Sequence, residues 1–289
     1  MVNAFESYSK EVDKELVPPL HNILDGRKLV YVTPAKGFGI TSVDWGKITE
    51  MSAGYVSYGF TDGNEDMIDV ALTNSKVPVY WKDYKVNRRL YEGWLRNNVD
   101  MDITSGISAG YQAAASENAA IINGVSNDGT NYDINGLYQG AGNTNASGGD
   151  FGTYGNPMNA VAGAKKLLID DGIPAYNIPL NLVLSPVQYA ELEASQSNGQ
   201  DEWPRVMRML NGGNIYSVSS SILTDGTGML LPTASAGQNY VDFYLTANWQ
   251  TEHGTDSKHP STSDLFGRVF SAGVLRIKQA NAICTLTSI

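Results

Sequence analysis

The segment 156–221 constrains the fold more than any other part of the chain, because a helix, an apolar strand, a second helix and another strand follow in close order. At its centre lies the apolar run Leu180–Leu184, which Ser185 and Pro186 end. Proline is tolerated in the first turn of a helix, where its missing N–H would have no intrahelical partner, so the pattern predicts a helix from Pro186. The segment offers no evident nucleophile, metal cluster or phosphate-binding loop. It therefore favours architecture over catalysis.

The surface of the folded protein is expected to be largely uncharged. Only 17% of the residues are charged, against about 25% in a typical globular domain, while 42% are hydrophobic. Neutral polar residues, including 16 tyrosines, must then cover much of the surface. Such a surface suits contact with other proteins, although a monomer with neutral polar loops is the alternative. The net charge of −10 argues against wrapping of nucleic acid.

The remaining compositional features point to a cytoplasmic protein. The lone Cys284 excludes an intrachain disulfide framework, and its apolar neighbours indicate a small buried side chain. The N-terminal residues include Glu6, Lys10 and Glu11, which argues against a signal peptide. No apolar run approaches the length of a membrane span.

Local patterns predict an α+β fold rather than an alternating, doubly wound sheet, because helices are inserted among antiparallel strand candidates. The predicted helices are 1–24, 103–122, 156–170, 186–192 and 202–210. The predicted strands or extended segments are 27–32, 42–80 as a long two-stranded excursion, 80–90, 180–184, 215–218, 241–246, 268–272 and 280–286. Two segments are predicted as loops, the Gly- and Asn-rich 125–155 and the polar 251–264.

One motif resembles a hydrolase active site. Residues 106–110 fit the G-x-S-x-G pattern, in which a strained turn between a strand and a helix exposes the nucleophile, here Ser108. Asp256 and His259 follow in the order that a catalytic triad would need. However, the preceding residues are too polar for a central strand, and Ser108 lies inside the predicted helix. A small-residue face of a packed helix is the alternative interpretation, and we expect no catalytic residue.

Other candidate sites are weaker. His253 and His259 could ligate a metal, but they lie in a polar segment without rigid ligand spacing, so we expect no metal site. The glycines at 140–142 and 148–149 lack the remainder of a phosphate-binding loop. A group of aromatic residues could stack a cofactor, although such residues more often form core or interfaces, and we expect no cofactor. The group comprises Trp45, Tyr55, Tyr58, Tyr80, Trp81, Tyr84, Tyr91 and Trp94.

Residues 26–32, followed by Pro34 and Gly37, resemble the N-terminal signature of encapsulins. Further blocks occur in the order of that family and extend the resemblance over nearly the whole chain. They are residues 90–93, Glu117, 121–124, 135–137, 180–192, 212–215 and 280–283. Each block is weak alone, and the order in which they follow one another carries the resemblance.

The resemblance implies the HK97-type capsid fold, which encapsulins share with the major capsid proteins of tailed viruses. It divides the chain into an N-terminal helix, arm and first P-domain strand (1–46), an E-loop (47–78), a P-domain with a spine helix (79–135), an A-domain (136–235) and P-domain return strands (236–289). It further implies that the E-loop lies across a neighbouring subunit and that the A-domains converge at symmetry axes, where they form pores.

The resemblance also implies a site for a cargo peptide on the inner wall of the shell. Arg27, Leu29 and Tyr31 match the family's N-terminal contribution, and Phe243 and Leu245 are candidates for the opposite side. An apolar groove with one fixed cation could hold a short tail that becomes ordered on binding. Tyr31 stands where the family commonly has an Asp, which removes a charge. The alternative role of Arg27 is a structural ion pair that holds the N-terminal arm.

We therefore expect a non-enzymatic protomer that assembles with itself into an icosahedral nanocompartment around a cargo protein in the cytoplasm, without membrane contact. The alternative is a major capsid protein of a virus or provirus, in which case the partner is DNA and the location is the virion. The third hypothesis is the hydrolase built on Ser108. Some encapsulins bind flavin through aromatic residues near the base of the E-loop. The sequence around Trp81 and Tyr84 is shifted by a few residues relative to that site, so the resemblance does not assign flavin binding to them. A capsid-type cross-link through Lys47 or Lys76 has no specific support.

Overall fold

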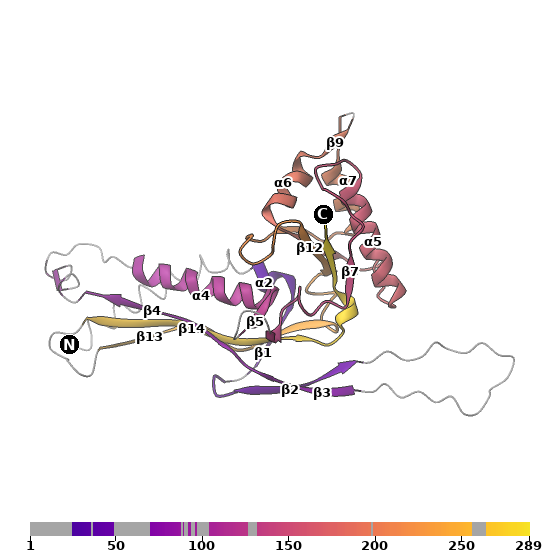
Figure 1. Ribbon diagram of the computed structural model, residues 1–289. Coiled ribbons are helices and arrows are strands. Elements are labelled where there is room, and N and C mark those ends of the chain that lie inside the picture. Colours follow the sequence, from indigo (N-terminus) through magenta and orange to yellow (C-terminus); the bar gives the residue numbers. More distant parts are fainter. Residues whose placement is uncertain are drawn as a thin grey trace, which may run out of the picture.

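The protein is described from a computed structural model, in which the chain forms two lobes and a projecting arm (Figure 1). The structure describes residues 25–35, 37–48, 70–87, 104–126, 132–197, 199–255 and 264–289, together with a few isolated positions between 89 and 96. The predicted helix over 1–24 and most of the predicted E-loop lie outside these residues. Within the described helices, none combines the length and the apolar character needed to cross a bilayer.

The upper lobe in Figure 1 is built on a five-stranded sheet with the order β11-β8-β12-β15-β7. Strand β12 is antiparallel to both its neighbours, whereas β11 runs parallel to β8 and β7 runs parallel to β15. The strands are β7 (Asn143–Asn145), β8 (Leu180–Leu184), β11 (Ile215–Ser217), β12 (Thr227–Pro232) and β15 (Cys284–Thr287). The helices are α5 (Asn156–Asp170), α6 (Pro186–Ala194) and α7 (Glu202–Met209).

Strand β8 is buried along its whole length, which explains why its sequence is apolar except for Asn181, whose Oδ1 accepts a hydrogen bond from the N–H of Asn214 at 3.1 Å. Leu182 and Leu184 pack into a core with α5 and α7, whereas Val183 packs into a second core at the junction with the lower lobe. Because successive side chains of a strand point to opposite faces, a strand buried on both faces needs apolar residues at nearly every position. The apolar run therefore marks the central layer of the molecule.

The helices of the upper lobe begin where the sequence predicts. Pro157 occupies the first turn of α5, and Pro186 begins α6 after Ser185 in an extended conformation. Helix α5 ends at Asp170, and Gly172 follows with a positive φ of 78°, a conformation that glycine adopts without steric cost.

The lower lobe is an elongated four-stranded sheet with the order β1-β13-β14-β4, and α4 lies along one face of it (Figure 1). Strand β1 runs parallel to β13, and the other two pairings are antiparallel. The strands are β1 (Tyr31–Pro34), β4 (Val79–Val86), β13 (Val241–Thr255) and β14 (Leu265–Ile277). The helices are α2 (Asp25–Leu29) and α4 (Thr104–Ile122).

Helix α4 confirms the prediction of a helix over 103–122 to within one residue. Its sheet-facing side carries small residues, among them Gly106, Gly110, Ala113 and Ala114, which are buried and allow close packing against β4 and β14. Its single charged residue, Glu117, is also fully buried. A buried carboxylate on an otherwise uncharged helix requires a partner, and this partner defines the site described below.

The arm consists of β2 (Ser42–Ile48) and β3 (Val70–Lys76), which form an antiparallel pair in agreement with the predicted two-stranded excursion. Trp45 is buried between the arm and the body of the protein and donates a hydrogen bond from Nε1 to Ser75 Oγ at 3.0 Å. On the opposite face of the hairpin, the side chain of Leu72 is 82% exposed. Figure 1 shows the arm projecting from beneath the lower lobe.

Several short elements complete the description. Within the described parts of the predicted loop 125–155, the chain forms β5 (Gly124–Ser126), β6 (Tyr132–Asn135) and β7, so these parts contain short strands where the low-complexity sequence predicted a loop. Strands β9 (Gln196–Ser197) and β10 (Gln200–Asp201) form a hairpin at the tip of the upper lobe, and η1 (Ala280–Ala282) is a single 3-10 turn.

Some predicted elements are wrong in extent or placement. Residues 27–29 lie in helix α2, not in a strand, because Gly26 brings the backbone close enough to α4 for a helical turn to pack there. Strand β13 runs into the polar segment 251–264 as far as Thr255, where a loop was predicted, because its end pairs with the start of β14 from Leu265 onward. Strand β12 was not predicted. Strand β15 pairs with β12 and β7 in the upper lobe, whereas the expected division placed it among the return strands of 236–289.

Candidate binding pocket

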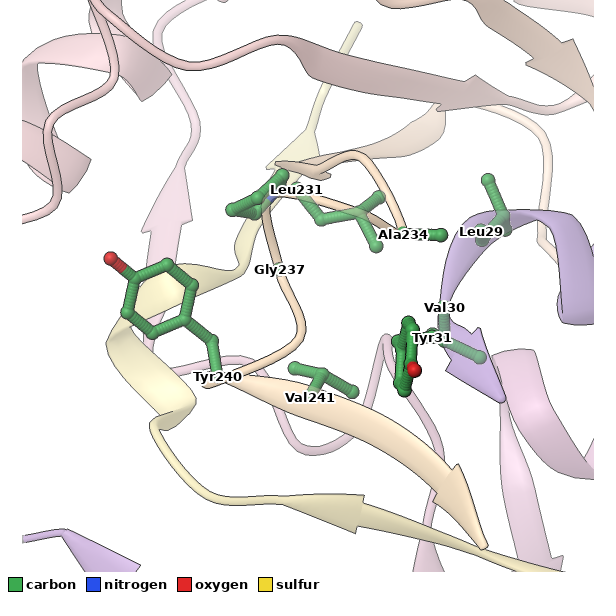
Figure 2. Close-up of a pocket in the computed structure, with 9 residues that line it drawn as sticks. Leu29, Val30, Tyr31, Leu231, Ala234, Gly237, Tyr240 and Val241 are labelled. Carbon is green, nitrogen blue, oxygen red and sulfur yellow. The ribbon is translucent and has the colours of Figure 1, made fainter. Parts of the chain in front are cut away.

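A pocket opens where the start of β1 meets the connection between β12 and β13 (Figure 2). The pocket is narrow, since the space open to the centre of a water-sized sphere is about 10 Å³. None of its lining residues is charged, and Tyr31 and Tyr240 lie at opposite ends of it (Figure 2). The lining consists of Leu29, Val30, Tyr31, Leu231, Pro232, Ala234, Gly237, Tyr240 and Val241. A concave apolar surface with a few polar tips is the usual form of a site for a small apolar group.

The connection between β12 and β13 is held by backbone hydrogen bonds. The N–H of Thr233 donates to Pro179 O at 3.0 Å, and the N–H of Gly237 donates to Thr233 O at 2.7 Å. Tyr240 and Val241 both donate to Gly237 O at 2.9 Å. A Cβ at Gly237 would lie 3.2 Å from Thr233 O, a tight contact that glycine avoids. This turn forms a firm wall of the pocket.

The opposite wall depends on α2 and β1. The register pairs Tyr31 with Asp242 and Val32 with Phe243. Paired residues of neighbouring strands project from the same face of a sheet, so Tyr31 lies on one face and Phe243 on the other, where α4 packs. On the Tyr31 face, the buried Asp242 accepts hydrogen bonds from Thr33 Oγ1 at 2.7 Å and from Arg276 Nε at 2.9 Å. This carboxylate is thus already paired within the chain.

Arg27 forms an ion pair with the fully buried carboxylate of Glu117, which is the second of the two roles considered above. Its Nη2 donates to Glu117 Oε2 at 2.8 Å, its Nε donates to Oε1, and its Nη1 donates to Asn248 Oδ1 at 2.9 Å. The guanidinium carbon lies 5.8 Å from the ring centres of Phe243 and of Trp249. A planar guanidinium can donate to both oxygens of a carboxylate and pack between aromatic rings at the same time. The ammonium group of lysine cannot reproduce this geometry.

A bulge in β13 helps to build this arrangement. Ala247 pairs with Ala272 and Gln250 pairs with Phe270, so that Asn248 and Trp249 together lie opposite Ser271. Bulges redirect side chains locally, and here two consecutive residues of β13 reach the guanidinium of Arg27. The sequence carries no recognisable signal for the bulge.

The Glu117 carboxylate also bonds to β14 and lies near the hydroxyl of Tyr80 on β4. Ser271 Oγ on β14 donates to Glu117 Oε2. Burial raises the pKa of the nearby Tyr80 hydroxyl well above its usual value, and the negative charge of Glu117 adds to the increase while Arg27 opposes it. Tyr80 therefore stays neutral and donates a hydrogen bond to Gly273 O at 3.2 Å. The network joins α2, α4, β4 and β14.

The five residues predicted for cargo binding all lie at this junction, but they do not form one surface. Leu29 and Tyr31 line the pocket. Arg27 lies behind the pocket in its ion pair with Glu117, and the fully buried Phe243 packs beneath Arg27. Leu245 is half-buried against the junction core and is not among the lining residues. The expectation that Phe243 and Leu245 line the groove is therefore not matched by the geometry.

Sequence reasoning missed most of the pocket wall contributed by residues 231–241. The missing prediction was β12, whose apolar residues Met229, Leu230 and Leu231 end at Pro232. An apolar run that stops at a proline is a signal for a strand followed by a turn, and it could have located this wall. The partner of Arg27 was detectable as well, since Glu117 is the only charged residue on its helix.

The other candidate sites receive no support from the described geometry. Ser108 lies in the second turn of α4 with Gly106 and Gly110 in the same helix, so the strained turn between a strand and a helix that a nucleophile elbow requires is not formed there. Asp256 and His259 lie outside the described residues. His253 contacts Tyr84, with 3.1 Å between its Nδ1 and the tyrosine hydroxyl. Within the described part of the chain, no group of three or more His, Cys, Asp or Glu side chains could hold a metal ion.

The aromatic residues considered above have different environments. Trp45, Tyr80 and Tyr84 are buried. Trp81 is 52% exposed on the face of the lower sheet that carries Arg268, whose guanidinium carbon lies 4.6 Å from the centre of the indole. The remaining members of that set, Tyr55, Tyr58, Tyr91 and Trp94, lie outside the described residues.

Comparison with protein-family models assigns this chain. The model described as "Encapsulating protein for peroxidase" matches residues 5–253, which is most of the sequence. The chain belongs to the encapsulin family. As a member of this family it is a structural shell protein, which assembles with further copies of itself into a nanocompartment.

Two curated relatives agree with this assignment. The chain is 27% identical over 272 residues to the diheme-cytochrome-encapsulin shell fusion protein of Kuenenia stuttgartiensis, covering 91% of this chain and 68% of the relative. It is 24% identical over 265 residues to the type 1 encapsulin shell protein EncA of Myxococcus xanthus, covering 91% and 86%.

Solved structures confirm the HK97-like capsid fold. The virus-like particle from Pyrococcus furiosus superposes with a TM-score of 0.62 at 17% identity, covering 92% of this chain and 97% of the other. The capsid of Myoviridae phage XM1 superposes with a TM-score of 0.64 at 13% identity, covering 90% of each chain. Shell proteins and phage capsids thus share this architecture.

Proposed function

We propose that the shell encloses a cargo protein in the cytoplasm, and that a short tail of this cargo packs an apolar side chain against the lining of the pocket between β1 and the β12–β13 connection. The observation that carries the proposal is the uncharged concave lining to which Leu29 and Tyr31 contribute. Support comes also from the family description, which names encapsulation of a peroxidase. The chain itself would contribute no catalytic residue.

The energetics of such a site suit a shell. Burial of one branched apolar side chain is worth about 1.5–3 kcal/mol, which gives weak binding for a single tail. A tail that orders on binding loses part of this free energy as entropy. A cargo protein with several subunits presents several tails to many identical pockets, and linkage of the binding events raises the total affinity by orders of magnitude. Weak individual pockets can therefore retain a cargo.

The five residues predicted from the sequence take two different roles in this proposal. Leu29 and Tyr31 contact the tail directly, together with Ala234 and Tyr240 on the other wall. Arg27, Phe243 and Leu245 stabilise the junction behind the pocket. The tail would therefore meet an apolar surface, without the free cation that the sequence alone led us to expect.

The domain division implied by the family resemblance remains a proposal as well. The upper lobe corresponds to the A-domain, which would meet its copies around symmetry axes, and the arm corresponds to the base of the E-loop, which would lie across a neighbour. The 82% exposure of Leu72 on the arm supports this proposal, because a two-stranded hairpin with an exposed leucine needs a covering surface. In a shell, a second copy provides that surface.

The alternative content of the particle is DNA, as in a viral capsid. The likeness to the phage XM1 capsid shows a shared fold and does not distinguish the two contents. Purified particles would be treated with nuclease and protease, opened, and examined by mass spectrometry and for nucleic acid. A protected protein with a defined stoichiometry supports the compartment, whereas protected genome-length DNA refutes it.

A variant pair tests the pocket itself. Ala234→Leu fills the pocket from its wall, whereas Ser235→Leu places the same side chain on the exposed neighbouring position, which does not line it. Both variants should assemble into particles of normal size. We expect the Ala234→Leu shells to lose most of the co-purifying cargo and the Ser235→Leu shells to retain it. Equal loading of the two variants would place the tail elsewhere.

A further inference from the structure

We infer that Arg27 acts as a positioning residue, which sets the pocket wall through its ion pair with Glu117, and that the pocket consequently selects a tail by apolar shape and not by negative charge. This inference rests on the proposed function of the pocket, and it names the chemistry of the partner that the pocket accepts. It gives Arg27, the cation that the sequence led us to expect in the site, a structural role in place of a contact with the ligand.

The ion pair neutralises the charge of Arg27 within the chain. The Arg27 guanidinium donates to both carboxylate oxygens of Glu117, and the side chain of Glu117 is fully buried. The side chain of Arg27 is only 13% exposed and is flanked by the rings of Phe243 and Trp249. A carboxylate buried this deeply requires its counter-charge, so the pair is neutral as a unit. Little of the guanidinium charge remains for a ligand.

Helix α2 connects the ion pair to the pocket. Helix α2 has only five residues and cannot be stable alone, so it is held by contacts with α4. Arg27 provides one contact, and the N–H of Gly26 provides another by donating to Asn118 Oδ1 at 2.6 Å. A Cβ at Gly26 would lie 2.8 Å from that oxygen, so the backbone of α2 lies directly against α4. Leu29 ends this helix, and Tyr31 follows after one residue.

The nine lining residues of the pocket are uncharged. The nearest acidic group on the Tyr31 face, Asp242, is paired with Arg276 and lies 3.4 Å from Lys278 Nζ. Both carboxylates beside the pocket thus have counter-charges within the chain, Glu117 from Arg27 and Asp242 from Arg276 and Lys278. The lining itself offers a negatively charged tail no cation, and such a tail meets a protein whose net charge is −10.

The inference is tested with a fluorescent protein that carries one of three C-terminal tails on the same Gly/Ser linker. The neutral tail contains one Leu, the acidic tail flanks this Leu with two Asp residues, and the basic tail flanks it with two Lys residues. Loading is the fluorescence that co-elutes with assembled shells. We expect wild-type shells to load the acidic tail no better than the neutral tail.

Variants separate positioning from charge. Glu117→Gln removes the counter-charge, so we expect these shells to favour the acidic tail over the neutral one by at least about threefold. Arg27→Lys retains the positive charge but cannot contact both carboxylate oxygens of Glu117, whereas Arg27→Gln removes the charge as well. We expect both variants to reduce loading of the neutral tail. Arg268→Lys is the matched control, because it alters an exposed arginine paired with Asp83, away from the pocket. It should leave loading unchanged.

The possible results are distinguishable. If wild-type shells load none of the three tails, the proposed pocket is refuted and the inference falls with it. If wild-type shells load tails but favour the acidic one several-fold, the pocket stands and the positioning role of Arg27 is refuted. Retention of neutral-tail loading by Arg27→Lys contradicts the inference in the same way. The wild-type comparison needs no variant, so it remains decisive even if the Glu117 or Arg27 variants fail to assemble.

Discussion

The core of the upper lobe and the junction between the lobes are built on different principles. The upper core is apolar at its centre, with side chains from α5, α7 and one face of the five-stranded sheet, and its buried charged groups bond either within one helix, as Glu202 does with Arg205, or to a backbone carbonyl, as Lys165 does with Met209. The junction core is also apolar, but hydrogen bonds join Arg27, Glu117 and Ser271 at its edge. Apolar packing is non-directional, whereas a two-pronged ion pair fixes both distance and orientation.

The difference indicates how the two regions divide their tasks. The upper core supplies stability and tolerates small rearrangements of side chains. The junction fixes the position of α2, which carries part of the proposed pocket wall. Buried ion pairs contribute little net stability but are costly to break, so they are a means of specifying geometry. Variants in the two regions should therefore differ in what they disturb.

The largest effect is expected for Glu117→Ala, which leaves the guanidinium of Arg27 without a counter-charge. We expect the free energy of unfolding to fall by about 3–5 kcal/mol. Urea-induced unfolding of the dissociated protomer, followed by tryptophan fluorescence, measures the change. The double variant Arg27→Met/Glu117→Leu removes both charges and should recover most of the stability while losing tail binding. A loss below about 1 kcal/mol in the single variant would contradict the comparison.

The next effect concerns the upper core. Leu184→Ala removes a fully buried side chain and should lower the free energy of unfolding by about 3 kcal/mol, through lost burial and a cavity. The same denaturation experiment measures it. In assembled shells, this variant should leave the tail-charge selectivity of the pocket unchanged, because the side chain packs away from the junction. The partly exposed Val187→Ala on α6 is the control and should change the free energy by less than about 0.5 kcal/mol.

A smaller effect is expected for Gly26→Ala. The added methyl group would lie 2.8 Å from Asn118 Oδ1 and 3.1 Å from Ile121 Cβ, so α2 must shift away from α4. We expect a loss of about 1–2 kcal/mol in the free energy of unfolding. Leu29 lines the pocket and moves with the helix, so loading of the neutral tail should also fall. This decrease should exceed the one expected from the loss of stability alone. Gly39→Ala, in open space, is the control. Normal tail loading by Gly26→Ala shells would argue against the coupling of α2 to the pocket.

The smallest effect involves the exposed pair of Asp83 and Arg268 in the lower sheet. The hydrogen bonds from Arg268 hold the pKa of Asp83 below its usual value. A lowered folded-state pKa contributes stability above the ordinary pKa of the carboxyl, and this contribution is lost as the pH falls through the folded-state value. Between neutral and acidic pH, the unfolding midpoint of Asp83→Asn should therefore decrease slightly less than that of the wild-type protein. An effect as large as that of Glu117→Ala would mean that this surface pair is structurally equivalent to the buried one.

Sequence patterns predicted the elements whose signals are local. The apolar run of β8, the proline that begins α6 and the periodicity of α4 each follow from neighbouring residues, and the structure confirms them. The pairing of β15 with β7 joins Cys284 to Asn143 across the chain, and such long-range pairing leaves no local signal. The same reason explains the missed wall of the pocket. Leu29 and Tyr31 were identified through family resemblance, whereas residues 231–241 join them only in three dimensions.

The role of Arg27 shows the same limit more sharply. The sequence allowed either a contact with cargo or a structural ion pair, because a single cation near an apolar strand fits both. The choice depends on Glu117, which is 90 residues away in the chain and is brought to Arg27 by the packing of α2 on α4. A bulge in β13 supplies the remaining contacts. Neither the packing nor the bulge is encoded in a pattern that short windows reveal.

The central claim is that the pocket between β1 and the β12–β13 connection holds the tail of an enclosed protein. Cryo-electron microscopy of cargo-loaded particles, compared with empty particles of the same protein, tests it most directly. The account predicts additional density on the inner wall, in contact with Leu29, Tyr31, Ala234 and Tyr240, and an unchanged ion pair between Arg27 and Glu117. Tail density at another surface, or a carboxylate of the tail bound to Arg27 in place of Glu117, would contradict it.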